Sequence, residues 1–180
     1  SIMATSVAIL AALKESGKIN EHSFHCVAGH SLGEYSALVA NKSLNFSDSV
    51  ELLKIRSKAM QESMPVGTGG MAAIIGGTED DIAATISDIS SEGKIFIAND
   101  NAVGQVVISG EMKAIDYIVE NSKKLGLKKV IKLSVSAPFH CEFMTKAAVT
   151  MQNEIDKFNF KSFDVPLYSN VTSLPCDETE

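Results

Sequence analysis

Residues 24–33 read FHCVAGHSLG, so a short apolar run leads directly into the pattern Gly-x-Ser-x-Gly. The run predicts a buried strand, and the helical spacing of Leu32, Tyr35 and Leu38 predicts a helix after it. A serine on such a sharp strand-to-helix turn has an exposed hydroxyl, and glycines on both sides allow close backbone approach. The helix also directs its unsatisfied N–H groups at this spot, so the Leu32 N–H can stabilise an oxyanion. A tight turn with a capping serine is the alternative, but this context favours Ser31 as a nucleophile.

A serine hydroxyl is a poor nucleophile near neutral pH and needs a base, for which the chain offers four histidines. His22 and His25 lie before or within the predicted strand, and His30 adjoins the serine, so its side chain should leave the turn in another direction. His140 follows a rigid Ala-Pro pair at a loop-to-helix junction, where functional groups are often displayed. From spacing alone, His140 is equally well interpreted as a catalytic base or as a structural histidine.

The remaining pattern predicts an α/β protein in two parts. Residues 2–14 form an apolar helix, and after residue 70 the elements become smaller and follow the order βαββαβ of a ferredoxin-like module. Its strands are expected at residues 71–75, 95–98, 105–109 and 127–133. We therefore predict a ferredoxin-like subdomain at 67–133, inserted into an α/β core formed by 1–66 and 134–180.

Several element ends carry their own signals. Gly17 fits the stop of the first helix and Gly126 the stop of the module's second helix. Ser47 and Thr78 are the expected N-caps of the helices that follow them. Residues 99–104, Asn-Asp-Asn-Ala-Val-Gly, should form a turn-rich link between two strands.

Bulk composition narrows the class of protein. The net charge of −6 argues against nucleic acid as the main partner, and no apolar run approaches the roughly 20 residues of a membrane span. No signal peptide opens the chain, which begins directly in a helical pattern, so we expect an internal piece of a longer protein. The three cysteines lack metal-binding spacing, which favours the reducing cytoplasm. No metal or redox cofactor is expected.

Three segments resemble one known family. Residues 29–38, GHSLGEYSAL, closely resemble the nucleophile segment of malonyl-CoA:acyl carrier protein transacylases and related acyltransferase domains. Residues 136–140, SAPFH, resemble the catalytic histidine segment of the same family. Asn99 and Asn101, with residues 104–110, resemble a further segment near its cleft. The similarity runs in order over essentially all 180 residues.

The resemblance implies an α/β-hydrolase-like core with the inserted ferredoxin-like subdomain, and a Ser31–His140 dyad. It implies transfer of a malonyl group from malonyl-CoA to acyl carrier protein through an ester on the serine, with His30, Phe139, Asn99 and Asn101 near the substrate. In this family a backbone carbonyl holds the histidine, and an amino-terminal loop supplies the second oxyanion donor. Both are expected outside these 180 residues.

Arg56 is the candidate for selecting the acyl group. On a helical wheel it falls among apolar residues, opposite a charged face with Glu51 and Lys58. A snorkelling arginine or a structural ion pair would also explain this position. The arginine of the family's acyl pocket matches Arg56, and its guanidinium could grip the free malonyl carboxylate with two hydrogen bonds.

Two other functions remain possible on the sequence. A serine hydrolase or thioesterase would use an acidic residue between serine and histidine, for which Asp100 and Asp116 are candidates. A catalytically incomplete domain could keep the fold without the chemistry. Five lysines between residues 123 and 132 form a basic cluster, which is either a solvated face or a docking surface for an acidic carrier protein.

Overall fold

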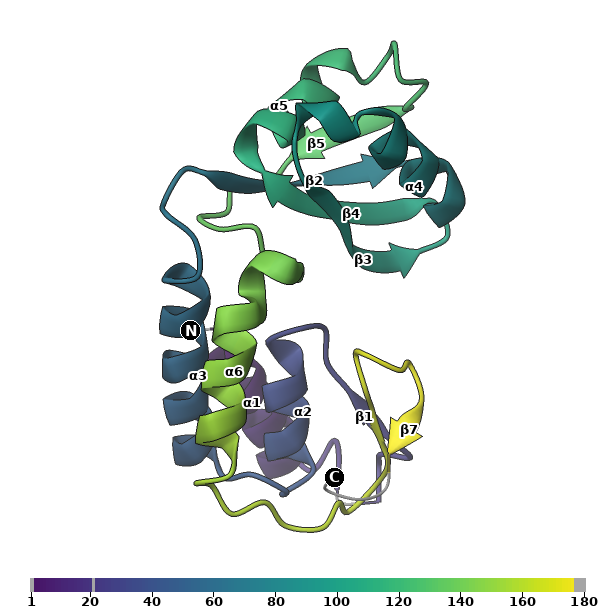
Figure 1. Cartoon of the computed structure of the whole chain (residues 1–180). Helices are drawn as coiled ribbons and strands as arrows, with labels where there is room; N and C mark the ends of the chain where they lie inside the picture. The colour runs from purple at the N-terminus through teal and green to yellow at the C-terminus, as the bar shows by residue number, and fades with distance from the viewer. Residues whose placement is uncertain (1, 21, 177–180) are drawn as a thin grey trace. The chain divides into compact units, whose positions relative to one another are not determined.

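The computed structural model describes residues 2–20 and 22–176, and the protein has the predicted mixed α/β fold (Figure 1). The chain separates into two compact units, Ser1–Ile55 with Asn153–Glu180 and Arg56–Gln152. The contacts group the end of the third helix and most of the last helix with the second unit. The predicted subdomain boundaries at 67 and 133 stay a prediction. No helix within the described residues has the length and apolarity of a membrane-spanning segment.

The first unit is built around a small sheet with the strand order β1-β6-β7. Its elements are α1 (Ile2–Glu15), β1 (Val27–Ala28), α2 (Gly33–Ala40), the start of α3 (Phe46–Gln61), β6 (Leu167–Tyr168) and β7 (Pro175–Cys176). β1 and β6 are parallel, and Ala28 pairs with Tyr168. α2 packs against both α1 and β1. The strand expected at 24–28 is therefore shorter than predicted, because β6 offers pairing to only its last two residues.

Asn41 ties this unit together across a long sequence separation. Its side chain is 1% exposed, donates from Nδ2 to the Val165 carbonyl at 2.8 Å and accepts the Val165 N–H at 3.0 Å. A buried amide with both its donor and its acceptor paired avoids the cost of burying a polar group. This pair anchors the segment entering β6 beside the end of α2.

The second unit carries a four-stranded antiparallel sheet in the order β3-β4-β2-β5. Its elements are β2 (Gly69–Ile75), α4 (Glu79–Asp88), η1 (Ser90–Glu92), β3 (Ile95–Ala102), β4 (Gln105–Glu111), α5 (Met112–Asn121), β5 (Lys129–Lys132), η2 (Glu142–Met144) and most of α6 (Thr145–Ile155). The predicted order βαββαβ is thus observed.

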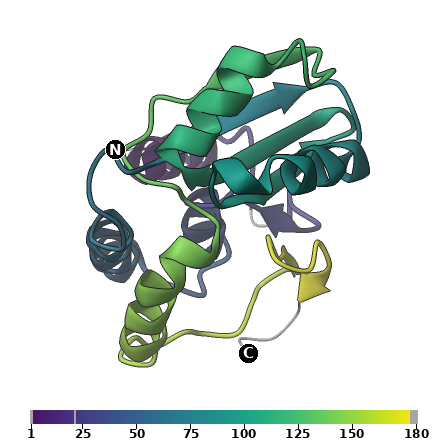
Figure 2. The same cartoon turned by 45° about the horizontal axis from the view of Figure 1, so that its top comes forward.

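The two faces of this sheet are covered differently. α4 and α5 lie on one face, as Figures 1 and 2 show, and bury a large cluster that includes Ile74, Ile82 and Ile115. On the other face Met71, Ala73 and Val107 form a smaller buried cluster. Partly buried side chains pack on this smaller cluster, namely Ala98, Leu133, Val135 and Phe139. The central strand β2 is buried on both faces, as its continuous apolar sequence requires.

Two of the expected helix signals are confirmed. Gly17 follows α1 in the left-handed conformation, with φ +71°. Thr78 forms a capping box with Asp81 at the start of α4. The hydrogen bonds from Thr78 lower the pKa of the Asp81 carboxyl, because they favour its charged form.

Three other expectations are wrong. α3 begins at Phe46 and is capped by Asn45, whose Oδ1 accepts the Asp48 N–H at 2.9 Å, so Ser47 is not the cap. α5 ends at Asn121, well before Gly126. β3 continues to Ala102 through two register shifts, and the turn to β4 shrinks accordingly. The local turn preference of residues 99–102 is overridden because β4 supplies a complete pairing partner.

Candidate active site

Ser31 sits at the turn between β1 and α2 that the sequence predicts. Its φ is +52°, a left-handed backbone that costs a non-glycine residue about 1–2 kcal/mol. The turn is closed by hydrogen bonds from the Gly33 N–H to the His30 carbonyl at 2.9 Å and from the Glu34 N–H to the Ser31 carbonyl at 3.1 Å. Strain of this kind persists only where the surrounding structure holds it, which is typical of functional sites.

The two glycines of the motif have different roles. A Cβ on Gly29 would lie closer than 3.0 Å to the backbone of Gly33 and Glu34, a separation that real Cβ atoms essentially never show. A Cβ on Gly33 would meet nothing within 4 Å. Close backbone approach therefore requires a glycine at position 29, whereas position 33 supplies the backbone that is approached.

The Leu32 N–H is available for an oxyanion. Within residues 2–20 and 22–176, no hydrogen bond from this N–H to a protein acceptor is found. Leu32 has helical φ and ψ angles of −54° and −31° and immediately precedes α2, so its N–H belongs to the unsatisfied first turn. A donor of this kind is what the predicted role needs.

Asn170 is a residue of this site that the sequence interpretation missed. It lies just after β6, and its Oδ1 accepts the Ser31 N–H at 2.9 Å. Its Nδ2 donates to the Gly29 carbonyl at 2.7 Å, and its own N–H donates to Glu34 Oε1 at 3.1 Å. The sequence shows it only as a polar residue at the end of a short strand-like run, residues 165–170, which does not reveal which turn it would reach.

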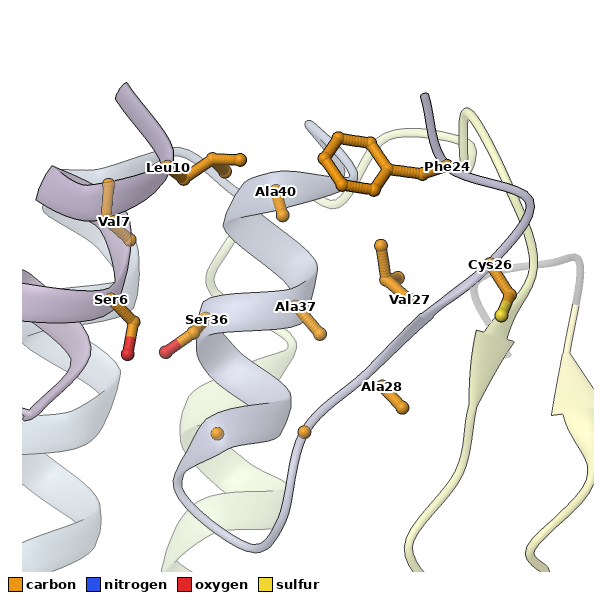
Figure 3. Close-up of a pocket in the computed structure, with 12 residues that line it drawn as sticks. Ser6, Val7, Leu10, Phe24, Cys26, Val27, Ala28, Ser36, Ala37 and Ala40 are labelled. Atoms are coloured by element: carbon orange, nitrogen blue, oxygen red, sulfur yellow. The ribbon is translucent and has the colours of Figure 1, made fainter. Parts of the chain in front are cut away.

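Two hollows adjoin the serine turn, which is the turn around Ser31 between β1 and α2. One, of about 400 Å³, lies at the carboxyl ends of β1 and β6 and is lined by His30 and Asn170 among others. The other, of about 460 Å³, lies between α1, α2 and β1 (Figure 3). Its walls are mainly small and apolar, and Ser6 and Ser36 point toward each other across it. Only the first hollow places polar side chains beside Ser31.

His140 sits in the second unit, on the loop between β5 and α6. It too has a left-handed backbone, with φ +58°, and its side chain is half-buried. The preceding Pro138 is fully buried, and a Cβ on Gly69 would come closer than 3.0 Å to its ring. Phe139 packs on the smaller apolar cluster of the sheet. The loop is therefore held against β2 by direct packing.

Polar contacts fix the same loop on either side of the histidine. Ser136 Oγ donates to Gln61 Oε1 at 2.5 Å, and Gln61 is half-buried near the end of α3. Cys141 Sγ donates to the Pro138 carbonyl at 3.1 Å and accepts from Ser109 Oγ at 3.7 Å. Burial raises the pKa of the Cys141 thiol, because it disfavours the thiolate.

The remaining predicted residues also lie in the second unit. Arg56 is half-buried on α3, where Leu52 is fully buried and Glu51 and Lys58 are exposed, as the helical wheel predicts. Asn99 and Asn101 lie on β3, where Asn99 is half-buried and pairs with Val107 and Asn101 is exposed. The substrate roles of these three residues stay predictions.

The structure thus brings the predicted residues into two groups. Ser31, His30 and Leu32 share the serine turn of the first unit, while His140 and Phe139 share the histidine loop of the second. Each group is held in place by contacts within its own unit, and a contact between the Ser31 hydroxyl and the His140 imidazole stays a prediction.

Comparison with known proteins gives this arrangement a context. The chain is 41% identical over 174 residues to a malonyl CoA-acyl carrier protein transacylase of Bacillus subtilis, covering 96% of this chain and 54% of that protein. It is similar to the crystal structure of an acyl-carrier-protein-S-malonyltransferase from Bartonella henselae, with a TM-score of 0.90, 44% identity, and coverage of 98% of this chain and 56% of that one.

A second similar structure is a complex of a type II PKS acyl-carrier protein with its malonyl-transacylase, with a TM-score of 0.89, 35% identity, and coverage of 98% of this chain and 56% of that one. The chain therefore spans about half the length of the curated relatives it matches. The model of the acyl transferase domain family matches residues 1–180. With its strained serine turn and histidine loop, the chain belongs to the acyl transferase domain family.

Proposed function

We propose that the protein carrying this chain transfers a malonyl group from malonyl-CoA to the phosphopantetheine thiol of acyl carrier protein, in fatty acid or polyketide synthesis in the cytoplasm. The observation that carries the proposal is the Ser31 turn, with its strained backbone and a Leu32 N–H that no acceptor among the described residues takes, in a chain 41% identical to a malonyl CoA-acyl carrier protein transacylase. The three unbridged cysteines are consistent with a reducing compartment.

The proposed reaction proceeds in two half-reactions. The His140 imidazole takes the proton of the Ser31 hydroxyl as its oxygen attacks the thioester carbonyl, and the Leu32 N–H stabilises the oxyanion. The intermediate collapses, the C–S bond breaks, and the imidazolium returns the proton to the leaving CoA thiolate. The carrier thiol then attacks the seryl ester by the same steps and regenerates the serine.

Mass spectrometry tests this proposal most directly. Incubation of the whole natural polypeptide with malonyl-CoA, without carrier, should leave a malonyl adduct on the peptide containing Ser31. Ser31→Ala should abolish the adduct, and His140→Ala should slow its formation by about 10³-fold or more. Absence of the adduct from the wild-type protein would contradict the function.

Arg56 is proposed to select malonyl over neutral acyl groups. Its planar guanidinium could hold the free malonyl carboxylate with two parallel hydrogen bonds, which a neutral acyl group cannot accept, and a difference of this kind discriminates more strongly than the fitting of a methylene. Arg56→Ala should lower malonyl transfer by about 100-fold and acetyl transfer far less. Lys58→Ala, on the exposed face of the same helix, is the matched control. Equal losses for both acyl groups would refute the role.

The lysine cluster is proposed to help dock the carrier. Lys123, Lys124, Lys128 and Lys129 are exposed, whereas Lys132 forms an ion pair with Asp116. Charge reversal of the exposed lysines should raise the KM for the carrier and leave adduct formation by malonyl-CoA unchanged, because steering acts on encounter. Reversal of Lys18 in the first unit is the control. An unchanged carrier KM would dismiss the docking role.

The proposal also includes the two fold assignments made from the sequence, a ferredoxin-like subdomain and an α/β-hydrolase-like core. The antiparallel order β3-β4-β2-β5, with both helices on one face, supports a ferredoxin-like subdomain at 67–133. The parallel β1–β6 pair leading into a serine turn supports an α/β-hydrolase-like core. A hydrolase triad gains no support from Asp116, whose carboxylate pairs with Lys132. A parallel assay that offers water and carrier thiol separates transferase from thioesterase.

A further inference from the structure

We propose that Asn170 is a positioning residue for the nucleophile, and that its carboxamide clamps the turn of Ser31 so that the Leu32 N–H is left to bind the oxyanion. The inference deepens the proposed function and rests on it for its catalytic consequence. Its geometric part concerns only the first unit and can be tested without turnover.

The clamp follows from how the strands pair. β1 and β6 are parallel, and Ala28 lies opposite Tyr168. Segments that leave the carboxyl ends of adjacent parallel strands emerge at the same edge of the sheet. Ser31 and Asn170 follow these paired positions closely, so residues 139 apart in the sequence come into contact.

The carboxamide is suited to the backbone groups it meets. Gly29 presents a carbonyl and Ser31 an N–H, at the two ends of one short turn, and Asn170 donates to the first at 2.7 Å and accepts from the second at 2.9 Å. The carboxamide carries a donor and an acceptor side by side on one planar group, so it satisfies both at once. The two bonds help to hold the left-handed conformation of Ser31, which is unfavourable by itself.

Glu34 holds the clamp from the helix side. Its Oε1 accepts the Asn170 N–H at 3.1 Å, from the first turn of α2, where a carboxylate is also favoured by the helix dipole. Glu34 thus fixes the backbone of the residue whose side chain fixes the turn. Turn and clamp form a closed set of contacts around the nucleophile.

The clamp also determines which backbone N–H of the turn is left to bind an oxyanion. Because Asn170 takes the Ser31 N–H, this group is not offered to a substrate oxygen. The adjacent Leu32 N–H has no protein acceptor in the described part of the chain. An aspartate at position 170 would keep the acceptor, lose the donor to Gly29, and place a negative charge beside the forming oxyanion.

Hydrogen exchange of the Ser31 amide, followed by NMR on the whole natural polypeptide, tests the geometry. Asn170→Ala should speed this exchange by about tenfold, the effect of one net hydrogen bond. Asn170→Asp should retain protection because it keeps the acceptor, and Asn159→Ala, on an exposed loop of the same unit, should change nothing. An unchanged Ser31 exchange rate in Asn170→Ala would overturn the clamp.

The catalytic consequence is read from the rate of Ser31 acylation by malonyl-CoA. Asn170→Ala and Asn170→Asp should both slow acylation by about 10- to 100-fold, as expected for a misplaced nucleophile, while the KM for malonyl-CoA stays within about twofold. Unfolding temperatures identify any variant that loses its fold. Acylation at the wild-type rate, or a loss confined to KM, would overturn the positioning role. A wild-type protein without a seryl adduct would instead contradict the proposed function, while the exchange result still decides the clamp.

Discussion

The serine turn at Ser31 and the histidine loop at His140 each hold a non-glycine residue in a left-handed backbone conformation, but different interactions stabilise them. Ser31 and His140 both have a left-handed backbone, with φ of +52° and +58°, and both side chains are half-buried. The serine turn is held by two hydrogen bonds with the Asn170 side chain, which accepts from the Ser31 N–H and donates to the Gly29 carbonyl. The histidine loop is held mainly by the packing of a buried proline and a phenylalanine against the sheet, to which the Ser136–Gln61 hydrogen bond and weaker sulfur contacts are added.

This difference predicts how strongly each region should respond to a mutation that adds a side-chain atom. Hydrogen bonds to a backbone turn act over short distances and in fixed directions, so the turn should respond sharply to steric change. Apolar packing is not directional, and a loop held by it can shift a little and retain much of its contact area. We therefore expect larger losses from changes at the serine turn than from changes of equal size at the histidine loop.

The largest effect should come from Gly29→Ala. The new Cβ would meet the backbone of Gly33, which cannot move aside as a flexible side chain can. We expect a loss of about 3 kcal/mol in the free energy of unfolding and about 100-fold in Ser31 acylation. Urea unfolding and the rate of adduct formation measure both.

Gly33→Ala is the matched control for stability. Its Cβ has open space, and alanine is favoured over glycine in a helix by about 0.5–1 kcal/mol, so this variant should unfold at the same or a higher urea concentration. If Gly29→Ala were as stable as Gly33→Ala, the predicted clash between a Cβ at position 29 and the backbone of Gly33 would be wrong.

A smaller effect is expected from Gly69→Ala on β2, which is the equivalent steric change because it acts on Pro138 of the histidine loop. The new Cβ would press on the Pro138 ring, and the loop should yield, lowering acylation by about tenfold and stability by about 1–2 kcal/mol. Gly70→Ala is the control, because its Cβ would press only on the flexible end of Met112 and would meet Ile115 at an ordinary contact distance of 3.8 Å. Losses as great as those of Gly29→Ala would show that both regions are equally rigid.

The smallest effect concerns Cys141. Its raised pKa favours the neutral thiol in the folded protein, so this contribution to stability is complete below the ordinary cysteine pKa and is lost as the pH rises through the folded value. At pH 8, iodoacetamide should therefore modify Cys141 more slowly than the exposed Cys26, as peptide mass spectrometry would reveal. Equal rates would contradict the burial of the Cys141 thiol.

Local sequence predicts much of the second unit and the serine turn. The apolar run of β2, the Thr78 capping box and the βαββαβ order were all readable because each depends on residues close together in the chain. The strand–turn–helix around Ser31 was readable for the same reason. Where the sequence interpretation was wrong, a distant partner decided: β4 extended β3 through a turn-like segment, and β6 limited β1 to two residues.

The sequence by itself determined which residues are predicted to carry the chemistry, since a serine between glycines and a histidine after Ala-Pro are local patterns. Tertiary structure alone decided what holds them. The Asn170 contact to Ser31 spans 139 residues and the Gln61 contact to Ser136 spans 75, and both exist only because strands and helices far apart in the chain are packed together. A carboxamide or hydroxyl has no preferred partner until packing places one within about 3 Å, so no local pattern could name these pairs.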